Sequence, residues 1–335
     1  MTDISLIDQG GDVAASARHI WVKAARRAGA GDLRFRAFAL GAAVAVTLIF
    51  AGVLFSLLAG AMPAFKAFGV SFITTEAWNP TEERFGALAS IYGTLVTSVI
   101  AMFIAVPVGI GIAIFLTELC PRPLRRPIAI AIELLAGIPS IIYGIWGLFV
   151  FAPWFQLHVQ QPIIDATSGV PVIGTLLGGA PYGIGVFTAS VILAIMVLPF
   201  ISAVMRDVFE TVPAMLKESA YGIGATTWEV MRHVVLPYTR VGVVGGIMLG
   251  LGRALGETMA VTFVIGNAHR LSASLTAPGN SIASALANEF TEAVGDSYFA
   301  ALIELGLILF AITTVVLAAS KLLLSRLARR EGTRT

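Results

Sequence analysis

The sequence is poor in charge, cysteine and histidine, and each shortage excludes something. Only 13% of the 335 residues are charged, whereas soluble domains carry about 25%, so most of the surface cannot face water. The single cysteine excludes an internal disulfide. The four histidines are scattered and show no metal-ligand spacing with cysteine or carboxylates, so we expect no metal site.

An ATP-binding loop is also missing. No segment matches G-x-x-x-x-G-K followed by Ser or Thr, the glycine-rich loop whose backbone N–H groups cradle nucleotide phosphates. We therefore predict that the chain is not an enzyme and carries no cofactor of its own. If ATP powers this protein, a separate partner subunit binds the ATP and its magnesium ion.

Long hydrophobic runs dominate the sequence. Apolar residues make up 57% of the chain, and its mean hydropathy is +0.87. A helix needs about 20 apolar residues to cross a bilayer, whereas barrel strands would alternate over about ten. We therefore predict an all-α integral membrane protein with six transmembrane helices. The expected spans are 37–62, 89–117, 128–153, 183–206, 239–265 and 298–324.

Basic residues gather in alternate connections. Most Lys and Arg residues lie in the N-terminal tail, the second and fourth connections, and the C-terminal tail, while the opposite loops hold only Lys66, Arg84 and Arg270. Since short loops rich in Lys and Arg stay in the cytoplasm, both termini are predicted to be cytoplasmic. The chain then divides into a cytoplasmic tail 1–36, a transmembrane domain 37–325 and a second cytoplasmic tail 326–335.

A polar segment, residues 213–237, interrupts the hydrophobic chain on the predicted cytoplasmic side. Pro213 suits a helix start, Gly224 permits a sharp turn, and a second short helix is expected to end before Pro237. Two helices around a glycine hinge suit docking into the groove of a partner, and an ordinary polar loop is the alternative. The residues expected to couple the chain to that partner are Glu218, Ala220, Gly224, Trp228, Glu229, Leu236 and Pro237.

Two opposite charges lie within the fifth apolar run. Arg253 and Glu257 each cost about 2.5–3.5 kcal/mol at the middle of a membrane helix, so we expect them to face the bundle interior or a wet cavity. At a spacing of four residues they would share a helical face. Arg253 could bind an anion with its forked donors, and Glu257 could hold the guanidinium or weaken anion binding. The alternative is a purely structural ion pair.

A break is expected in the third run. Pro139 removes a helical hydrogen bond, and Gly137 loosens the same turn. The Ser140 hydroxyl could satisfy the freed carbonyl groups, and a broken helix could offer backbone groups to an ion. A packing kink without any functional role explains the pattern equally well.

These segments together resemble the permease subunits of the bacterial phosphate-specific (Pst) ABC importer. Residues 218–237 are similar to the EAA loop of ABC-importer permeases, which reads E-A-A, three residues, G, nine residues, I-x-L-P; Ser219 replaces the first Ala. The resemblance covers about residues 85–325 and points to the PstC-type member of the permease pair. The resemblance also rests on segments 91–94 (IYGT), 135–140 (LAGIPS), 252–258 (GRALGET) and 279–282 (GNSI).

The resemblance implies a fold, partners and a location. The fold would be the type I ABC-importer permease (MetI-like) architecture, in the bacterial cytoplasmic (inner) membrane and surrounded by lipid. The partners would be a second related permease (PstA-type), two copies of an ATPase (PstB-type) and a periplasmic phosphate-binding protein (PstS-type), with no nucleic acid. Arg253 and Glu257 match positions linked to phosphate passage in the family.

The resulting prediction is a permease subunit of an ATP-driven importer that moves inorganic phosphate. Three alternatives stay open from the sequence. The substrate could be another oxyanion, such as sulfate, molybdate or phosphonate. The chain could be a self-sufficient secondary anion transporter, against which the EAA-like spacing argues, or a membrane sensor without flux.

Overall fold

The computed structural model describes the backbone of residues 9–332 and the side chains of residues 31–326. Two compact units divide the chain, residues 1–59 and residues 60–335. The described part of the first unit is one continuous helix, α1 (Gln9–Phe68), which runs on into the second unit. Residues 1–8 of the predicted N-terminal tail lie outside the described residues.

The described residues fold into helices, and their one isolated β-bridge joins Asn79 to Arg84. The prediction of an all-α chain is thus confirmed for this part of the protein. The remaining helices are α2 (Ser71–Thr74), α3 (Leu88–Ile114), α4 (Arg122–Ala136), α5 (Ser140–Trp146), α6 (Ala152–Phe155), α7 (Gln161–Thr167), α8 (Ile173–Leu177), α9 (Val186–Glu210), α10 (Ala214–Gly222), α11 (Thr227–Val230), α12 (Leu236–Leu255), α13 (Met259–Ile265), α14 (Ile282–Glu289) and α15 (Asp296–Gly332).

Six of the described helical segments are long and apolar enough to cross a membrane, as predicted. Several join neighbouring helices through single π-helical turns, such as Phe115–Leu119 after α3 and Met231–Val235 before α12. The six segments are Gly31–Phe68, Leu88–Leu119, Ser140–Thr167, Val186–Glu210, Thr227–Leu255 and Asp296–Arg326.

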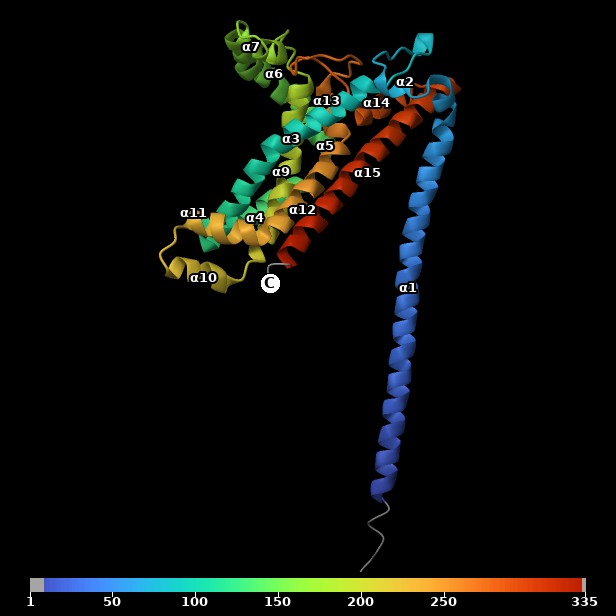
Figure 1. The fold of residues 1–335 in the computed structure, drawn as a ribbon, viewed down its shortest axis with the longest axis vertical. Helices are drawn as coiled ribbons and strands as arrows, with labels where there is room; N and C mark the ends of the chain where they lie inside the picture. Colours follow the sequence, from blue (N-terminus) through green and yellow to red (C-terminus); the bar gives the residue numbers. More distant parts are fainter. Residues whose placement is uncertain (1–8, 333–335) are drawn as a thin grey trace, which may run out of the picture. The chain divides into compact units, whose positions relative to one another are not determined.

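The core of the second unit forms around α9. Two thirds of the apolar stretch of α9 is buried, a larger share than in any other of the six segments, and Leu193, Val197 and Ile201 are fully buried. Helices α3, α4, α12 and α13 all pack against it, and Figure 1 labels α9 between α3 and α12. Because α9 faces protein on most sides, it fixes the positions of the helices that carry the candidate site.

Glycines allow α12 to approach α9 closely. A Cβ atom added at Gly246 would lie 2.9 Å from Val204, and one at Gly250 would lie 2.9 Å from Ile201. Small residues of this kind let membrane helices pack backbone to backbone. The last turns of α12 are therefore held firmly against the core.

Two predicted spans have wrong boundaries because the apolar runs contain helix breaks. The third expected span, 128–153, is two helices, since α4 ends at Ala136 and α5 begins at Ser140; the membrane-length segment runs on to Thr167. The fifth expected span, 239–265, breaks at residues 256–258 between α12 and α13. Hydropathy averages over such breaks, so it cannot place them.

The fifth segment also begins earlier than predicted. The helix that starts at Thr227 passes through the π-helical turn Met231–Val235 and continues into α12, with Pro237 in the first turn of α12. The expectation that the short helix ends before Pro237 is therefore wrong. A wider turn directly before a proline accommodates its ring and its missing N–H.

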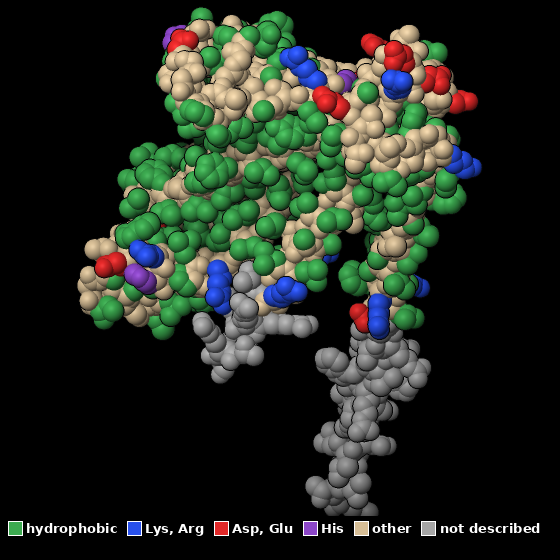
Figure 2. All heavy atoms as spheres, turned by 45° about the horizontal axis from the view of Figure 1, so that its top comes forward, with side chains coloured by type: hydrophobic (Ala, Val, Ile, Leu, Met, Phe, Trp, Pro, Cys, Tyr) green, Lys and Arg blue, Asp and Glu red, His purple; other side chains and the backbone are tan. Residues whose placement is uncertain are grey.

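The ends of the bundle carry its charge. Figure 2 shows hydrophobic side chains in a broad band across the helices, with Lys, Arg, Asp and Glu gathered toward the borders of this band. Helices α10 and α11 lie at the end of the bundle where α15 finishes, and α14 lies at the opposite end (Figure 1). This distribution fits a protein whose middle faces lipid.

Candidate functional site

Arg253 lies in the last turn of α12 and points away from the core. Its neighbours Ala254 and Leu255 are buried, while Arg253 itself is exposed. Its guanidinium carbon lies 5.8 Å from the ring centroid of Phe200 on α9, within the range of a cation–π contact. The described residues provide no carboxylate partner for it, so this guanidinium remains available to an anion.

Glu257 lies beyond the end of α12, whereas the sequence predicts that it shares a helical face with Arg253. Helix α12 ends at Leu255, so Arg253 and Glu257 do not share a helical face, and the described contacts contain no ion pair between them. Glu257 Oε1 instead accepts a hydrogen bond of 3.2 Å from the N–H of Ala260 at the start of α13. The local ion pair that the sequence left open is absent from the described residues, because the helix breaks between the two residues.

The side chain of Glu257 lines a small cavity of about 10 Å³ inside the bundle. Thr94, Thr97 and Ser98 of α3 line the same cavity. These hydroxyl residues were not predicted as site residues. Their recurrence from Ser90 through Ser98 on one side of an apolar helix is a signal that the sequence does carry.

The break at Gly137–Pro139 is present, as the sequence predicts. The Leu135 carbonyl oxygen accepts a hydrogen bond of 2.9 Å from the Tyr143 hydroxyl and a second from the N–H of Ile138. The described residues show no hydrogen bond from the Ser140 hydroxyl, so Tyr143 and not Ser140 bonds across the break. Tyr143 reaches back across the break because it stands one turn into α5.

The two helix breaks come together in space. Helix α5, which follows the break at Pro139, packs against α13, which follows the break at Glu257. The contact passes over Gly144, where an added Cβ atom would lie 2.9 Å from the Met259 carbonyl oxygen. Two segments about 120 residues apart in sequence thus form one region of irregular backbone, of the kind tolerated where membrane proteins enclose a cavity.

The polar segment 213–237 forms an elbow at the end of the bundle. Helix α10 is followed by Gly224, whose φ of +90° is a conformation that favours glycine, and the next helix starts at Thr227. The predicted glycine hinge is therefore present. Trp228 is 63% exposed and Ile223 is 88% exposed, so apolar side chains point outward from a polar segment.

Glu229 does not project as a free docking residue. Its side chain accepts a hydrogen bond of 2.8 Å from the N–H of Thr226, while the Thr226 hydroxyl accepts one of 3.3 Å from the N–H of Glu229. This reciprocal capping box fixes the start of the helix. Glu218 and Pro237 are exposed, whereas Ala220 and Leu236 pack partly against the core.

A groove lies in the elbow, between the end of α10 and the helix that starts at Thr227. Its volume is about 410 Å³, and Gly224 and Glu229 lie in its wall. On the bundle side, Lys217 Nζ pairs with Glu118 Oε1 and Arg206 pairs with Glu133 Oε1. The elbow thus combines an outward apolar surface with ionic contacts to the bundle.

A family of transport proteins matches this chain. The family described as "Binding-protein-dependent transport system inner membrane component" matches residues 105–329. The phosphate transport system permease protein PstC of Mesorhizobium japonicum is 62% identical over 92% of this chain and 94% of its own length. The PstC protein of Pasteurella multocida is 61% identical over 90% of this chain and 94% of its own length.

The chain belongs to this family of inner membrane components, in its PstC branch. A more distant member, the probable PstC protein of Methanocaldococcus jannaschii, is 36% identical over 84% of this chain. The family resemblance drawn from residues 85–325 is thereby confirmed. The chain is a multi-pass membrane protein.

Solved structures show the same fold. A bacterial ABC transporter involved in the import of the acidic polysaccharide alginate matches 87% of this PstC-branch chain with a TM-score of 0.57 and 17% identity. The MetNI methionine ABC transporter matches 71% of it with a TM-score of 0.53 and 17% identity. The predicted MetI-like importer architecture is confirmed.

A polar cluster that the sequence did not reveal lies at the end of the bundle opposite the elbow. Glu289 accepts hydrogen bonds of 2.5 Å from Trp78 Nε1 and 2.7 Å from the Tyr298 hydroxyl, and its other oxygen pairs with His269. Burial raises the pKa of Glu289, but these three donors outweigh burial and leave its pKa below the ordinary value. The cluster joins the loops that carry Trp78 and His269, and the end of α14, to the start of α15.

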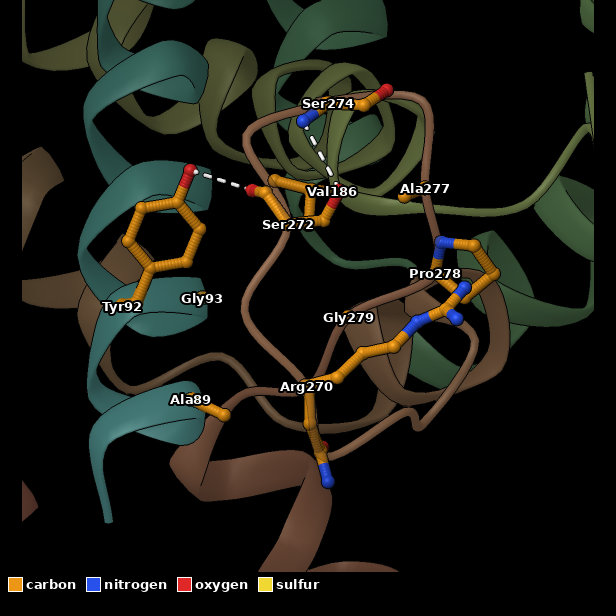
Figure 3. A pocket seen from close by; sticks show the side chains of 11 residues that line it. Ala89, Tyr92, Gly93, Val186, Arg270, Ser272, Ser274, Ala277, Pro278 and Gly279 are labelled. Atoms are coloured by element: carbon orange, nitrogen blue, oxygen red, sulfur yellow. Dashed lines mark hydrogen bonds between the residues drawn. The ribbon is translucent and has the colours of Figure 1, made fainter. Parts of the chain in front are cut away.

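A second small cavity lies beside this cluster. It has a volume of about 10 Å³ and lies between the start of α3 and the loop before α14. Figure 3 shows the hydroxyl of Tyr92 directed at Ser272, whose carbonyl oxygen accepts its hydrogen bond of 3.3 Å, and Arg270 extending along Pro278. In the described part of the chain, no group of three His, Cys, Asp or Glu residues could hold a metal ion.

Proposed function

We propose that this chain is the permease subunit of an ATP-driven ABC importer that carries inorganic phosphate into the cell. The observation that carries this proposal is the 62% and 61% identity, over nine tenths of the chain or more, to proteins named as phosphate transport system permeases. It favours phosphate over sulfate, molybdate or phosphonate. The ABC-permease fold argues against a self-sufficient secondary transporter.

The subunit that hydrolyses ATP is a separate ATPase, in two copies, which would bind the elbow. Exposed apolar side chains at Ile223 and Trp228 supply a docking surface, and the ion pair between Lys217 and Glu118 joins that surface to the bundle. Closure of the ATPases then pushes on the elbow and tilts the spanning helices. Since the sequence has no phosphate-cradling loop, this chain contributes motion and a path but no bond chemistry.

The path for the anion passes Arg253. Its guanidinium is exposed at the end of α12. Among the described residues, its one contact that involves the charge is the cation–π contact with the Phe200 ring. In a full complex, a second, related permease would cover this face. Arg253 then offsets the cost of removing phosphate from water, and binding stays weak enough for the ion to leave.

The family resemblance implies one further partner, and the distribution of charge implies the orientation. A periplasmic phosphate-binding protein would deliver the anion to the outer loops, and the elbow and both termini would face the cytoplasm. The membrane is then the bacterial cytoplasmic membrane. The six membrane-length segments agree with two termini on one side.

Reconstitution into liposomes tests this function. The chain with a second permease, two ATPase copies and a phosphate-binding protein should accumulate labelled phosphate only with ATP, and unlabelled sulfate should not compete. The Arg253→Gln variant should lose uptake while still assembling with the ATPase. Uptake by the purified chain alone, driven by an ion gradient without ATP, would overturn the proposal.

A further inference from the structure

We propose that Ser98, Ser281 and Glu257 form an internal transit subsite for a protonated phosphate anion, at the cavity enclosed by α3, the α12–α13 junction and the start of α14. The inference rests on the proposed function and deepens it. It adds a second point on the path of the anion, inside this chain, to Arg253 on the exposed face.

The walls of the cavity are more polar than the surrounding bundle. Polar residues make up five of the nine that line it: Thr94, Thr97 and Ser98 of α3, together with Glu257 and Ser281. The other four are Ala254, Leu255, Val261 and Ala283. The volume of about 10 Å³ is close to the space that one water molecule occupies. Phosphate is larger, so this conformation is the closed one, and passage requires α3 to separate from the α12–α13 junction.

The hydroxyl groups of Ser98 and Ser281 can each donate a hydrogen bond to a ligand. Thr94 and Thr97 already donate to carbonyl oxygens one turn earlier in α3. Ser98 is 1% exposed, and its hydroxyl has no hydrogen-bond partner in the described structure. The Ser281 oxygen accepts from the N–H of Ser284, which leaves its proton available. A buried hydroxyl without a partner is unfavourable unless a ligand or water satisfies it in another state.

Helix α14 adds a favourable field for an anion. Ser281 caps its N-terminus, and both Ser281 and Ala283 of its first turn line the cavity. The positive end of a helix dipole stabilises negative charge within about one turn. The helix end and the unpartnered Ser98 hydroxyl therefore converge on the same space.

The carboxylate of Glu257 decides which anions fit. The Ala260 N–H holds this side chain in the cavity wall. An ionised carboxylate only accepts hydrogen bonds, so an anion beside it must bring a proton of its own. Phosphate and arsenate keep a proton at neutral pH and sulfate does not, which makes the subsite selective for the first two.

An entrance to the subsite lies directly beside it. Gly93 and Asn280 line the outer cavity of Figure 3, and the next residues in the chain, Thr94 and Ser281, line the inner one. The backbones touch between the two cavities, since a Cβ added at Gly93 would lie 1.8 Å from the Asn280 carbonyl oxygen. The exposed Arg270 at the outer cavity attracts the anion before α3 moves.

A matched pair of variants on α3 tests the subsite in the complete importer. Ser98→Ala removes a donor to a charged ligand, so phosphate uptake should fall about tenfold with ATP hydrolysis retained, and Ser98→Thr should recover part of it. Ser90 is the control, because its hydroxyl is also buried and unpartnered, yet it does not line the cavity; Ser90→Ala should leave uptake near the wild-type level. Equal effects of Ser98→Ala and Ser90→Ala would overturn the subsite.

Cysteine labelling gives a readout that does not depend on uptake. The chain has one cysteine, so Cys120→Ala with Ser98→Cys places a single thiol at the cavity of the assembled complex. During ATP turnover, inorganic phosphate and arsenate should slow labelling by a small thiol reagent, and sulfate should not. Equal labelling with and without phosphate overturns the subsite. A wild-type complex that takes up no phosphate would instead refute the proposed function.

Discussion

Lys217 Nζ lies 2.6 Å from Glu118 Oε1, and this ion pair joins the elbow helix α10 to the turn that follows α3. The two side chains are 18% and 8% exposed, so the pair is largely shielded from water. Helix α3 also carries Ser98. A movement of the elbow is therefore transmitted to α3, the helix that closes the proposed subsite. The ion pair between Lys217 and Glu118 is the direct contact that transmits it.

Breaking this pair should uncouple the motor from the path. Lys217→Met leaves the Glu118 carboxylate buried without its partner, which costs about 3–5 kcal/mol in buried pairs. We expect fewer phosphate ions taken up per ATP hydrolysed, measured together in proteoliposomes. Lys217→Arg should retain coupling, and adding Glu118→Gln to Lys217→Met should recover part of the loss. Normal stoichiometry in Lys217→Met would show that force reaches α3 by another contact.

The hinge at Gly224 should tolerate no side chain. Gly224→Ala places a Cβ atom on a residue with φ of +90°, which costs about 1–2 kcal/mol, and Gly224→Pro cannot adopt that φ at all. Both should lower the coupling ratio, with the proline variant the more severe. Gly222→Ala is the control, since Gly222 ends a helix with open space around it. Equal behaviour of the alanine variants would place the hinge elsewhere.

The ring of Phe200 should position Arg253. Phe200→Leu removes the cation–π contact at 5.8 Å, worth about 0.5–1 kcal/mol at an exposed site, so we expect a two- to fivefold loss of phosphate uptake with unchanged assembly. Phe103→Leu on the exposed face of α3 serves as control. If both leucine variants transport alike, the aromatic contact has no part in the path.

The cluster around Glu289 should weaken in acid. Its pKa in the folded protein lies below the ordinary value of 4.5, so its stabilisation is complete above that pH and disappears as the pH falls through the lower folded value. The difference in thermal unfolding midpoint between wild type and Glu289→Gln should hold from pH 7 to about pH 5 and shrink below. Tyr298→Phe removes a donor and should move the loss to higher pH. A difference that grows in acid would contradict this assignment.

Several features followed from the residues themselves. The hydrophobic runs predicted six membrane-length helices, because length and hydropathy act locally. Gly137 and Pro139 predicted a helix break that the structure contains, and Gly224 predicted the hinge, because backbone restrictions of proline and glycine are properties of single residues.

Other features escaped the sequence because they depend on neighbours that are distant along the chain. The break after Leu255 is invisible to hydropathy, so Arg253 and Glu257 were placed on one helical face, whereas they face different surroundings. Tyr143 rather than Ser140 bonds across the other break.

Local chemistry thus determined that the chain is helical, embedded in a membrane, broken at Pro139 and hinged at Gly224, because each of these depends on a few consecutive residues. Only the tertiary structure decided which groups meet. Lys217 pairs with Glu118, and Ser98, Glu257 and Ser281 line one shared cavity. Such contacts depend on how α3, α10, α12 and α14 are arranged around α9. Because they join segments far apart in the sequence, no single segment predicts them.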